Sequence, residues 1–475
     1  MVFSSFEFLL FFPIVSFLYF AIPYQFRWIL LLISSCIFYA FFKWEYIFIL
    51  FFTIIIDYYA GIWIDKSEGR QRKMALAVSL IANIGVLAMF KYYYFLIDNV
   101  NSVSFRLNGS TYEPRWDIIL PIGLSFHTFQ AMSYTIEVYR RNQKVERHFG
   151  IYALYVMFYP QLVAGPIERP QNILHQFYEK FDFEEKRVVS GLRLMLWGFF
   201  KKIVIADNLA TFSDQVFDDV HQYQGLPLIV AILFYSVQIY CDFSGYSDIA
   251  IGSARVMGFK LMRNFERPYL SKSISEFWKR WHISLSTWFR DYLYFPLGGN
   301  RVPIPRWYLN LMIVFLVSGL WHGASWNFVI WGGLHGLYQI AGHLTKNIQA
   351  AIFKPLGKVG DLIQNWWTVA LVVFAWIFFR ATNFSDAKYF ATHLFSKSTH
   401  NLFEVIDMVK IDTLIGIVIS LTILYVVERM ENYRNMGQWV ESKPQWQRWG
   451  IYYAVLFFIL IYGYFGAMQF IYFQF

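Results

Sequence analysis

The chain has 475 residues, of which 57% are hydrophobic and 15% charged, and its formal net charge is +9. A soluble domain carries about 25% charged residues, so this composition excludes a soluble globular protein and indicates a polytopic membrane protein. Two cysteines, Cys36 and Cys241, are too few for a disulfide framework or a cysteine-based metal site. We therefore expect one all-α integral membrane domain over residues 1–475.

Apolar stretches recur along the whole chain. They occupy about residues 6–22, 28–42, 46–64, 74–96, 118–138, 226–240, 308–321, 326–343, 366–381, 412–427 and 451–471. The first has no basic segment before it, which predicts a membrane helix rather than a cleavable signal peptide. Several are shorter than the roughly 20 residues of a full crossing, which predicts re-entrant helices buried in protein.

Basic residues cluster in short loops between the apolar stretches, chiefly at Asp65–Lys73 and Arg140–His148. Such loops are typical of the cytoplasmic side of a membrane, where they face anionic lipid, so we expect no nucleic-acid partner. Two predicted crossings separate these loops, so both can be cytoplasmic. Further along, two prolines and a glycine interrupt Pro160–Arg169, which predicts a bent, re-entrant segment.

The segment Ser273–Arg290 carries large apolar residues at helical spacing, including Trp278 and Trp281. This stripe predicts one amphipathic helix against the membrane, with Ser273 as its cap. His282 falls inside the stripe and is therefore expected to point inward. A histidine at the boundary between helix and lipid headgroups is the alternative interpretation.

His322 lies in Ser318–Asn327, between two apolar runs. An ionisable side chain at such a position is expensive and indicates a functional site. A buried neutral imidazole is suited to accept a hydroxyl proton as a general base, and a structural histidine bonded to a neighbouring helix is equally compatible. His335 follows 13 residues later, about 220° round a continuous helix, which predicts a packing role on another face.

Asp242 lies in the apolar run Tyr240–Ile251, so it requires a partner. It either orients an imidazole or caps a helix terminus near Gly245. There is no glycine-rich phosphate loop, no G-x-S-x-G turn and no metal-ligand spacing. We therefore expect neither a metal nor a bound cofactor.

Three motifs, Phe277–Ser286, Tyr294–Asn300 and Ser318–Gly323, resemble the signature of membrane-bound O-acyltransferases, in particular the bacterial alginate O-acetyltransferase branch. The similarity runs from about residue 1 to 475 and is most specific between 240 and 336. The resemblance implies a helical bundle around a central tunnel, with short re-entrant and amphipathic helices. It places His322 deep in the tunnel and His282 as the second family histidine.

The resemblance also implies a reaction. An acetyl group would pass from a cytoplasmic thioester, acetyl-coenzyme A or an acyl carrier protein, toward an extracytoplasmic alginate-type polysaccharide. His322 would accept the hydroxyl proton while His282, Asp242 or backbone amides support the developing charge, and a covalent acyl-histidine relay is the alternative. Supporting or tunnel-lining roles are expected for Trp278, Trp281, Trp321 and Asn327.

The resemblance further implies a multi-pass protein of the bacterial inner membrane that works with an extracytoplasmic acetyltransferase. The charged surface around Arg280 and Arg290 would attract an anionic donor or, alternatively, lipid. D-alanyl transfer to teichoic acid and acetylation of peptidoglycan or cellulose are alternatives within the same chemistry. A transporter or lipid flippase is the alternative from a different class, and it predicts a repeat symmetry that the sequence does not show.

Overall fold

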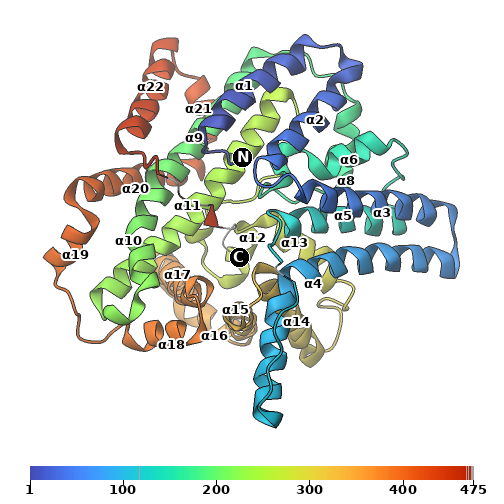
Figure 1. Cartoon of the computed structure of the whole chain (residues 1–475). Helices are drawn as coiled ribbons and strands as arrows, with labels where there is room; N and C mark the ends of the chain where they lie inside the picture. Colours follow the sequence, from blue (N-terminus) through green and yellow to red (C-terminus); the bar gives the residue numbers. More distant parts are fainter. Residues whose placement is uncertain (117, 467, 469, 472–475) are drawn as a thin grey trace. The chain divides into compact units, whose positions relative to one another are not determined.

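The computed structural model describes residues 1–116, 118–466, 468, 470 and 471, and its regular secondary structure over these residues is helical (Figure 1). The predicted all-α fold class is therefore confirmed. The chain divides into two compact units, Met1–Met195 with Ile249–Met262 and Leu196–Asp248 with Arg263–Phe475. The chain passes from one unit to the other within the helices α9 (Glu185–Phe199) and α11 (Leu226–Met257), and again after α11 between Met262 and Arg263. That the whole chain forms one domain stays a prediction.

Long apolar helices give the chain its membrane character. Within the described residues, six helical stretches are long and apolar enough to cross a membrane. They are Tyr46–Lys66, Gly69–Leu107, Leu226–Met257, Ile304–His322, Lys346–Arg380 and Ile411–Glu431. Their outward faces are apolar, because side chains such as Ile81 and Val418 are more than half exposed. A multi-pass membrane protein presents this kind of surface to lipid.

The first unit consists mainly of eight helices. These are α1 (Phe6–Ala21), α2 (Arg27–Ala40), α3 (Tyr46–Lys66), α4 (Gly69–Asn108), α5 (Leu124–Tyr139), α6 (Phe149–Met157), α7 (Tyr159–Leu162) and α8 (Pro170–Ile173). Helix α4 is longer than the apolar stretch 74–96, because it continues to Gly109, whose φ of 71° ends it in the left-handed conformation. The predicted bend at Pro160–Arg169 is confirmed: α7 has four residues and is buried.

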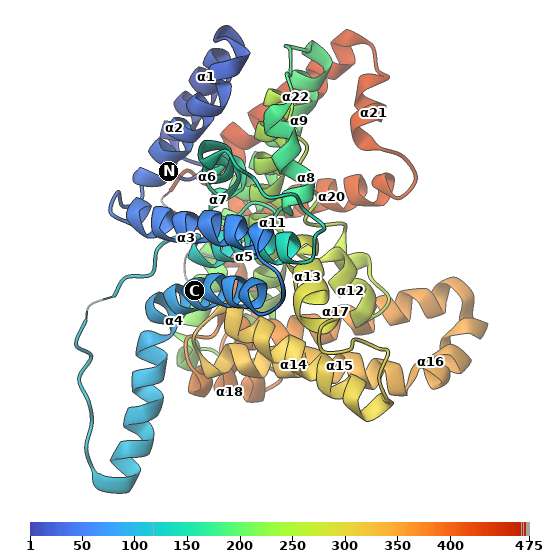
Figure 2. The ribbon, with the colours of Figure 1, turned by 90° about the vertical axis from the view of Figure 1, so that its right-hand side faces the viewer.

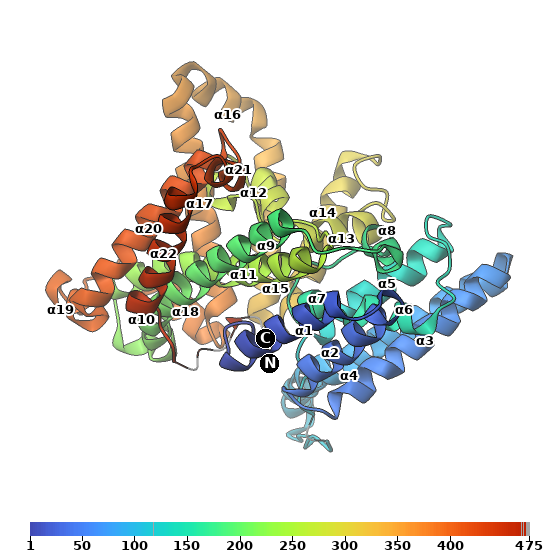
Figure 3. The ribbon, with the colours of Figure 1, turned by 90° about the horizontal axis from the view of Figure 1, so that it is seen from above.

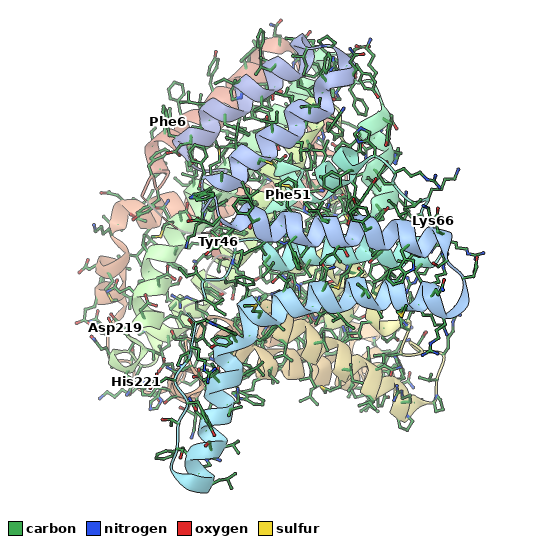
Figure 4. The ribbon with its side chains drawn as sticks, turned by 45° about the vertical axis from the view of Figure 1, so that its right-hand side comes forward. Phe6, Tyr46, Phe51, Lys66, Asp219 and His221 are labelled. Carbon is green, nitrogen blue, oxygen red and sulfur yellow. The ribbon has the colours of Figure 1, made fainter. Side chains whose placement is uncertain are left out.

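Helices α3, α4 and α5 pack side by side (Figure 2), and Figure 4 labels Tyr46 and Lys66 at the two ends of α3. A fully buried polar cluster joins them. Asp57 accepts hydrogen bonds from Ser79 Oγ at 2.6 Å and from Asn83 Nδ2 at 2.8 and 2.9 Å, and Ser79 also contacts Thr135. Between helices in a membrane, such polar contacts replace the hydrophobic effect as a source of specific association.

The second unit contains the remaining helices. These are α10 (Asp207–Asp218), α12 (Ile274–Arg280), α13 (Ile283–Phe289), α14 (Ile304–His322), α15 (Trp326–Leu344), α16 (Lys346–Phe353), α17 (Gly357–Arg380), α18 (Phe384–His393), α19 (Leu402–Val409), α20 (Ile411–Glu431), α21 (Met436–Glu441) and α22 (Gln445–Tyr462). Helix α16 folds back beside the start of α17, as Figure 3 shows from above.

Helices α14 and α15 of the second unit pack closely against each other. A Cβ added to Gly319 would lie 2.1 Å from the carbonyl oxygen of Phe328, and one added to Gly332 would lie 2.3 Å from that of Phe315. Only glycine permits this separation of the two backbones. Because a link of three residues joins the helices, the end of α14 and the start of α15 are held together at His322.

Candidate active site

His322 is the last residue of α14 and is 4% exposed. Its imidazole makes edge-to-face contacts with Trp321, Trp331 and Phe379, at centroid distances of 4.9, 5.0 and 5.2 Å. Helices α14, α15 and α17 therefore contribute aromatic walls to one buried ring cluster. Aromatic rings of this size remove water from the imidazole they surround.

His335 belongs to the same ring cluster, so the prediction that it lies on a different face from His322 is wrong. That prediction assumed one continuous helix, whereas the chain turns between α14 and α15. Trp331 contacts both imidazoles at 5.0 Å. Trp278 Nε1 donates a hydrogen bond to His335 Nδ1 at 3.3 Å, which leaves the proton of a neutral His335 on Nε2.

His282 separates two helices, so the prediction of a single amphipathic helix over Ser273–Arg290 is wrong. Helix α12 ends at Arg280, α13 begins at Ile283, and His282 between them has a left-handed φ of 43°. The predicted cap is confirmed, because Ser273 Oγ accepts from the backbone of Glu276. The break leaves His282 fully buried, as the stripe predicted.

Asn264 holds the His282 ring in one tautomer. Its Oδ1 lies 3.1 Å from His282 Nδ1, 3.2 Å from the backbone nitrogen of Ser284 and 2.9 Å from Ser284 Oγ. A backbone N–H can only donate, so the atom facing it is the amide oxygen. His282 Nδ1 must then carry the proton, and Nε2 carries the lone pair.

Burial also fixes the charge of His282. It lies outside the six candidate spans, and desolvation lowers the pKa of its imidazole to about 3. At neutral pH the ring is therefore uncharged, with Nε2 as a hydrogen-bond acceptor. The indole of Trp321 lies 6.2 Å from this ring and 4.9 Å from His322, so one side chain contacts both histidines.

Asp242 serves a different partner from the predicted imidazole. Its carboxylate forms an ion pair with Lys202 Nζ at 2.8 Å and accepts a hydrogen bond from the backbone of Ile471 at 2.9 Å. Lys202 also pairs with Asp207 at 2.7 Å, and all three charged side chains are buried. Asp242 therefore belongs to a charge network, and the side chain that orients the His282 imidazole is Asn264.

The remaining predicted residues are Trp281, Asn327, Arg280 and Arg290. Trp281 is 1% exposed and packs on Trp376 at 5.1 Å. Asn327 joins helix ends, since its Nδ2 donates to the carbonyl of Ala381 at 2.8 Å. The guanidinium groups of Arg280 and Arg290 form ion pairs with Glu276 at 2.6 Å and with Asp291 at 2.8 Å.

Sequence reasoning missed Asn264, Trp331 and Phe379. Phe379 lies in an apolar run whose rings have no periodicity that singles one out, and Trp331 lies in a second run of the same kind. Asn264 stands 18 residues before its imidazole partner, in a segment without helical or strand pattern. A polar amide beside aromatic residues, as in Asn264–Phe265, is the only local signal.

The long apolar helices define a multi-pass membrane protein, and three buried histidines, His282, His322 and His335, lie in one aromatic cluster of its second unit. Residues 72–384 match the model of the MBOAT, membrane-bound O-acyltransferase family. The chain belongs to this family, and it is an O-acyltransferase.

Known relatives cover most of the chain. It is 39% identical over 410 residues to a probable alginate O-acetylase of Pseudomonas aeruginosa. This alignment covers 85% of this chain and 76% of the relative. It is 36% identical over 390 residues to a peptidoglycan O-acetyltransferase of Helicobacter pylori, with 75% and 71% covered. A teichoic acid D-alanyltransferase of Streptococcus thermophilus is 28% identical over 272 residues, with 53% and 64% covered.

Proposed function

We propose that the protein transfers an acetyl group from a cytoplasmic thioester toward O-acetylation of an alginate-type polysaccharide outside the membrane. The observation that carries this proposal is the burial of His282 and His322 against one indole, that of Trp321, in a water-poor aromatic centre. The similarity to alginate O-acetylases over 85% of the chain supports the acetyl group and the acceptor.

In the proposed step, an acceptor hydroxyl oxygen attacks the carbonyl carbon of the thioester. The hydroxyl proton passes to His322, the carbon–oxygen bond forms, and the carbon–sulfur bond breaks. The thiolate leaves and takes the proton from His322, so that the histidine returns to its starting state. This is general base followed by general acid catalysis by one residue.

His282 assists as an acceptor in this proposal. A neutral imidazole whose Nδ1–H is bonded to Asn264 has no proton at Nε2 to donate to an oxyanion. It can accept a hydrogen bond from a second hydroxyl group of the acceptor and so hold the acceptor while the attacking hydroxyl donates its proton to His322. The role of stabilising negative charge therefore belongs to other groups than His282 or Asp242.

Two donors of the ring cluster are suited to that role: Trp331, which contacts His322, and His335, which contacts Trp331. Trp331 Nε1 and His335 Nε2 are buried, and neither is hydrogen-bonded to another residue in the described part of the chain. Fixed donors in a site without bulk water stabilise developing negative charge strongly, by about 3–4 kcal/mol for one oxyanion-hole donor. We assign the carbonyl oxygen of the thioester to these two groups.

The setting follows from the same proposal. The donor is acetyl-coenzyme A or an acyl carrier protein as co-substrate, with no resident cofactor. The membrane is the bacterial inner membrane, and an extracytoplasmic acetyltransferase completes delivery of the acetyl group to the polysaccharide.

The test compares cells that carry wild type, His322→Ala or His343→Ala at matched membrane levels. His343 is an exposed histidine of α15 and serves as the control. Mild base releases ester-bound acetate from the isolated polysaccharide. Loss of acetate only in His322→Ala supports the proposal, whereas unchanged acetate in that variant contradicts the role of His322.

Peptidoglycan is the second candidate acceptor, because a peptidoglycan O-acetyltransferase is 36% identical over 75% of the chain. The same cells decide between the two acceptors. Acetate lost from purified peptidoglycan, with the exopolysaccharide unchanged, assigns the second candidate. D-alanine esters lost in place of acetate assign alanyl transfer.

A further inference from the structure

The first unit contains a cavity of about 150 Å³, and none of the residues that line it belongs to the histidine cluster. The end of α1, the start of α2, the start of α6 and the segment 177–179 line it. Its polar lining includes Arg27, His148 and Glu179, and its aromatic lining includes Trp28 and Tyr178. No step of the proposed transfer uses these residues.

Arg27 is a buried cation without a carboxylate. Its side chain is 7% exposed, Nη1 donates to the carbonyl of Phe181 at 2.6 Å, and the guanidinium lies over the ring of Tyr19 at 4.8 Å. Among the described residues, no carboxylate lies within ion-pair distance of it, and its Nε has no hydrogen bond. A guanidinium removed from water requires an anion to offset the cost of desolvation.

His148 adds a second group suited to an anion. Its Nδ1 accepts the backbone N–H of Ile151 at 3.2 Å and so caps the nine-residue helix α6. The neutral ring therefore has its proton on Nε2, as a donor. The positive end of a helix dipole and this N–H group act together with Arg27 on the same cavity.

The wall between these groups is fixed by close packing. The ring of Trp28 meets His148 edge to face at 4.8 Å. A Cβ on Gly150 would lie 2.2 Å from the Trp28 ring, so only glycine leaves space for the indole here. The lining is therefore formed before any ligand enters. Glu179 at the rim is half exposed and has its own partner in His175 at 3.7 Å.

The cavity lies at the end of the unit that carries the basic loops. Arg147, next to His148, pairs with Asp65 at 3.4 Å, which joins the two loops that the positive-inside rule assigns to the cytoplasm. Outside the cavity, the exposed residues Ile29, Ile33 and Ile37 follow each other at helical spacing along α2. This apolar stripe offers a path for an acyl chain.

We propose that this cavity binds a phosphate ester, with Arg27 and His148 Nε2 as its donors. Two sources present that group at a cytoplasmic membrane face: a phospholipid headgroup whose acyl chains follow α2, and the phosphates of a coenzyme A thioester. The second source rests on the proposed function and the first does not, so failure of the acetyl assignment leaves the lipid source standing.

The experiment uses the full-length protein, purified in detergent and stripped of lipid. Binding of dioctanoyl phosphatidylethanolamine and, separately, of the unreactive desulfo-coenzyme A is titrated by native mass spectrometry. Wild type is compared with Arg27→Gln and with Arg147→Gln, which removes the same charge from an exposed position on the same end. His148→Asn keeps a good helix cap and removes the Nε2 donor together with the ring contact to Trp28.

We expect at least tenfold weaker binding in Arg27→Gln, because the charge-assisted hydrogen bond from the guanidinium to the phosphate is lost. A smaller loss is expected in His148→Asn and none in Arg147→Gln. Arg27-dependent binding of the lipid alone assigns the headgroup, and Arg27-dependent binding of desulfo-coenzyme A alone assigns the donor. If His148→Asn and Arg27→Gln bind both ligands as wild type does, or if wild type binds neither, the proposal is overturned.

Discussion

Replacing Asn264 by leucine tests the proposed role of the His282 tautomer most directly. Leucine has nearly the same shape as asparagine but accepts no hydrogen bond. In this variant the three donors that meet at Asn264 Oδ1, from His282 and Ser284, lose their acceptor. The His282 ring is then free to carry its proton on Nε2, where the lone pair is needed.

The expected magnitude follows from these contacts. Each buried donor left without an acceptor costs about 1–3 kcal/mol, so a clear loss of thermal stability is expected. Transfer activity should fall by roughly 10- to 100-fold beyond the loss of folded protein. The hydrogen bond that keeps the proton of His282 on Nδ1 contributes a free energy in the same range of about 1–3 kcal/mol, and its loss removes the acceptor form of the ring. Asn264→Asp keeps an acceptor at the same position and is expected to preserve activity within a few-fold.

The assay is ester-bound acetate per folded enzyme, measured from pH 3 to 9 for wild type and both variants. A carboxylate at position 264 favours protonated His282, so Asn264→Asp should move the acidic limb of the profile to higher pH. A merely structural asparagine would not shift that limb. Full activity in Asn264→Leu, or equal loss in both variants with an unshifted profile, would refute the reasoning.

Three further predictions concern other parts of the second unit. His335→Phe should keep the fold and lower the rate of acetyl transfer by about 10²-fold, measured as initial rate at saturating donor, because a proposed oxyanion donor is lost; an unchanged rate excludes that role. Gly319→Ala places a methyl group against the Phe328 carbonyl and should lower the melting temperature in detergent by several degrees, whereas Gly342→Ala, with nothing within 4 Å of the added atom, should not. The unfolded chain binds a proton at His282 below about pH 6.5, whereas the folded chain does so only near pH 3. The contribution of His282 to stability should therefore fall by about 1.4 kcal/mol per pH unit as pH drops from 6.5 toward 3, and His282→Asn should show a shallower fall in melting temperature over that range than wild type.

Composition and periodicity predict much of this molecule because they depend on neighbours in the sequence. The apolar stretches predict the long helices, and Ser273 before an apolar run predicts a cap. The stripe that includes Trp281 also predicts correctly that His282 is buried. These features follow from the spacing of side chains on a helix and from the cost of polar groups in hydrocarbon.

The rest depends on contacts between distant segments. The left-handed residue at His282 is held by an amide 18 positions earlier, and no local preference for a helix break accompanies it. His335 joins the ring cluster because the chain reverses after His322, which a continuous helical projection cannot represent. Asp242 is assigned to Lys202 by the register of two neighbouring helical segments, and periodicity within one segment contains no information on that register.

The close packing of rings around His322 also affects whether the thioester is hydrolysed by water or transferred to the acceptor. A thioester beside a general base is open to attack by water as well as by a sugar hydroxyl, and water is present at tens of molar outside the protein. Three aromatic contacts at about 5 Å leave little room for a second, disordered nucleophile next to the imidazole. Futile hydrolysis is thereby suppressed by shape, so that thinning this wall, as in Phe379→Ala, should convert part of the enzyme's turnover into thioesterase activity.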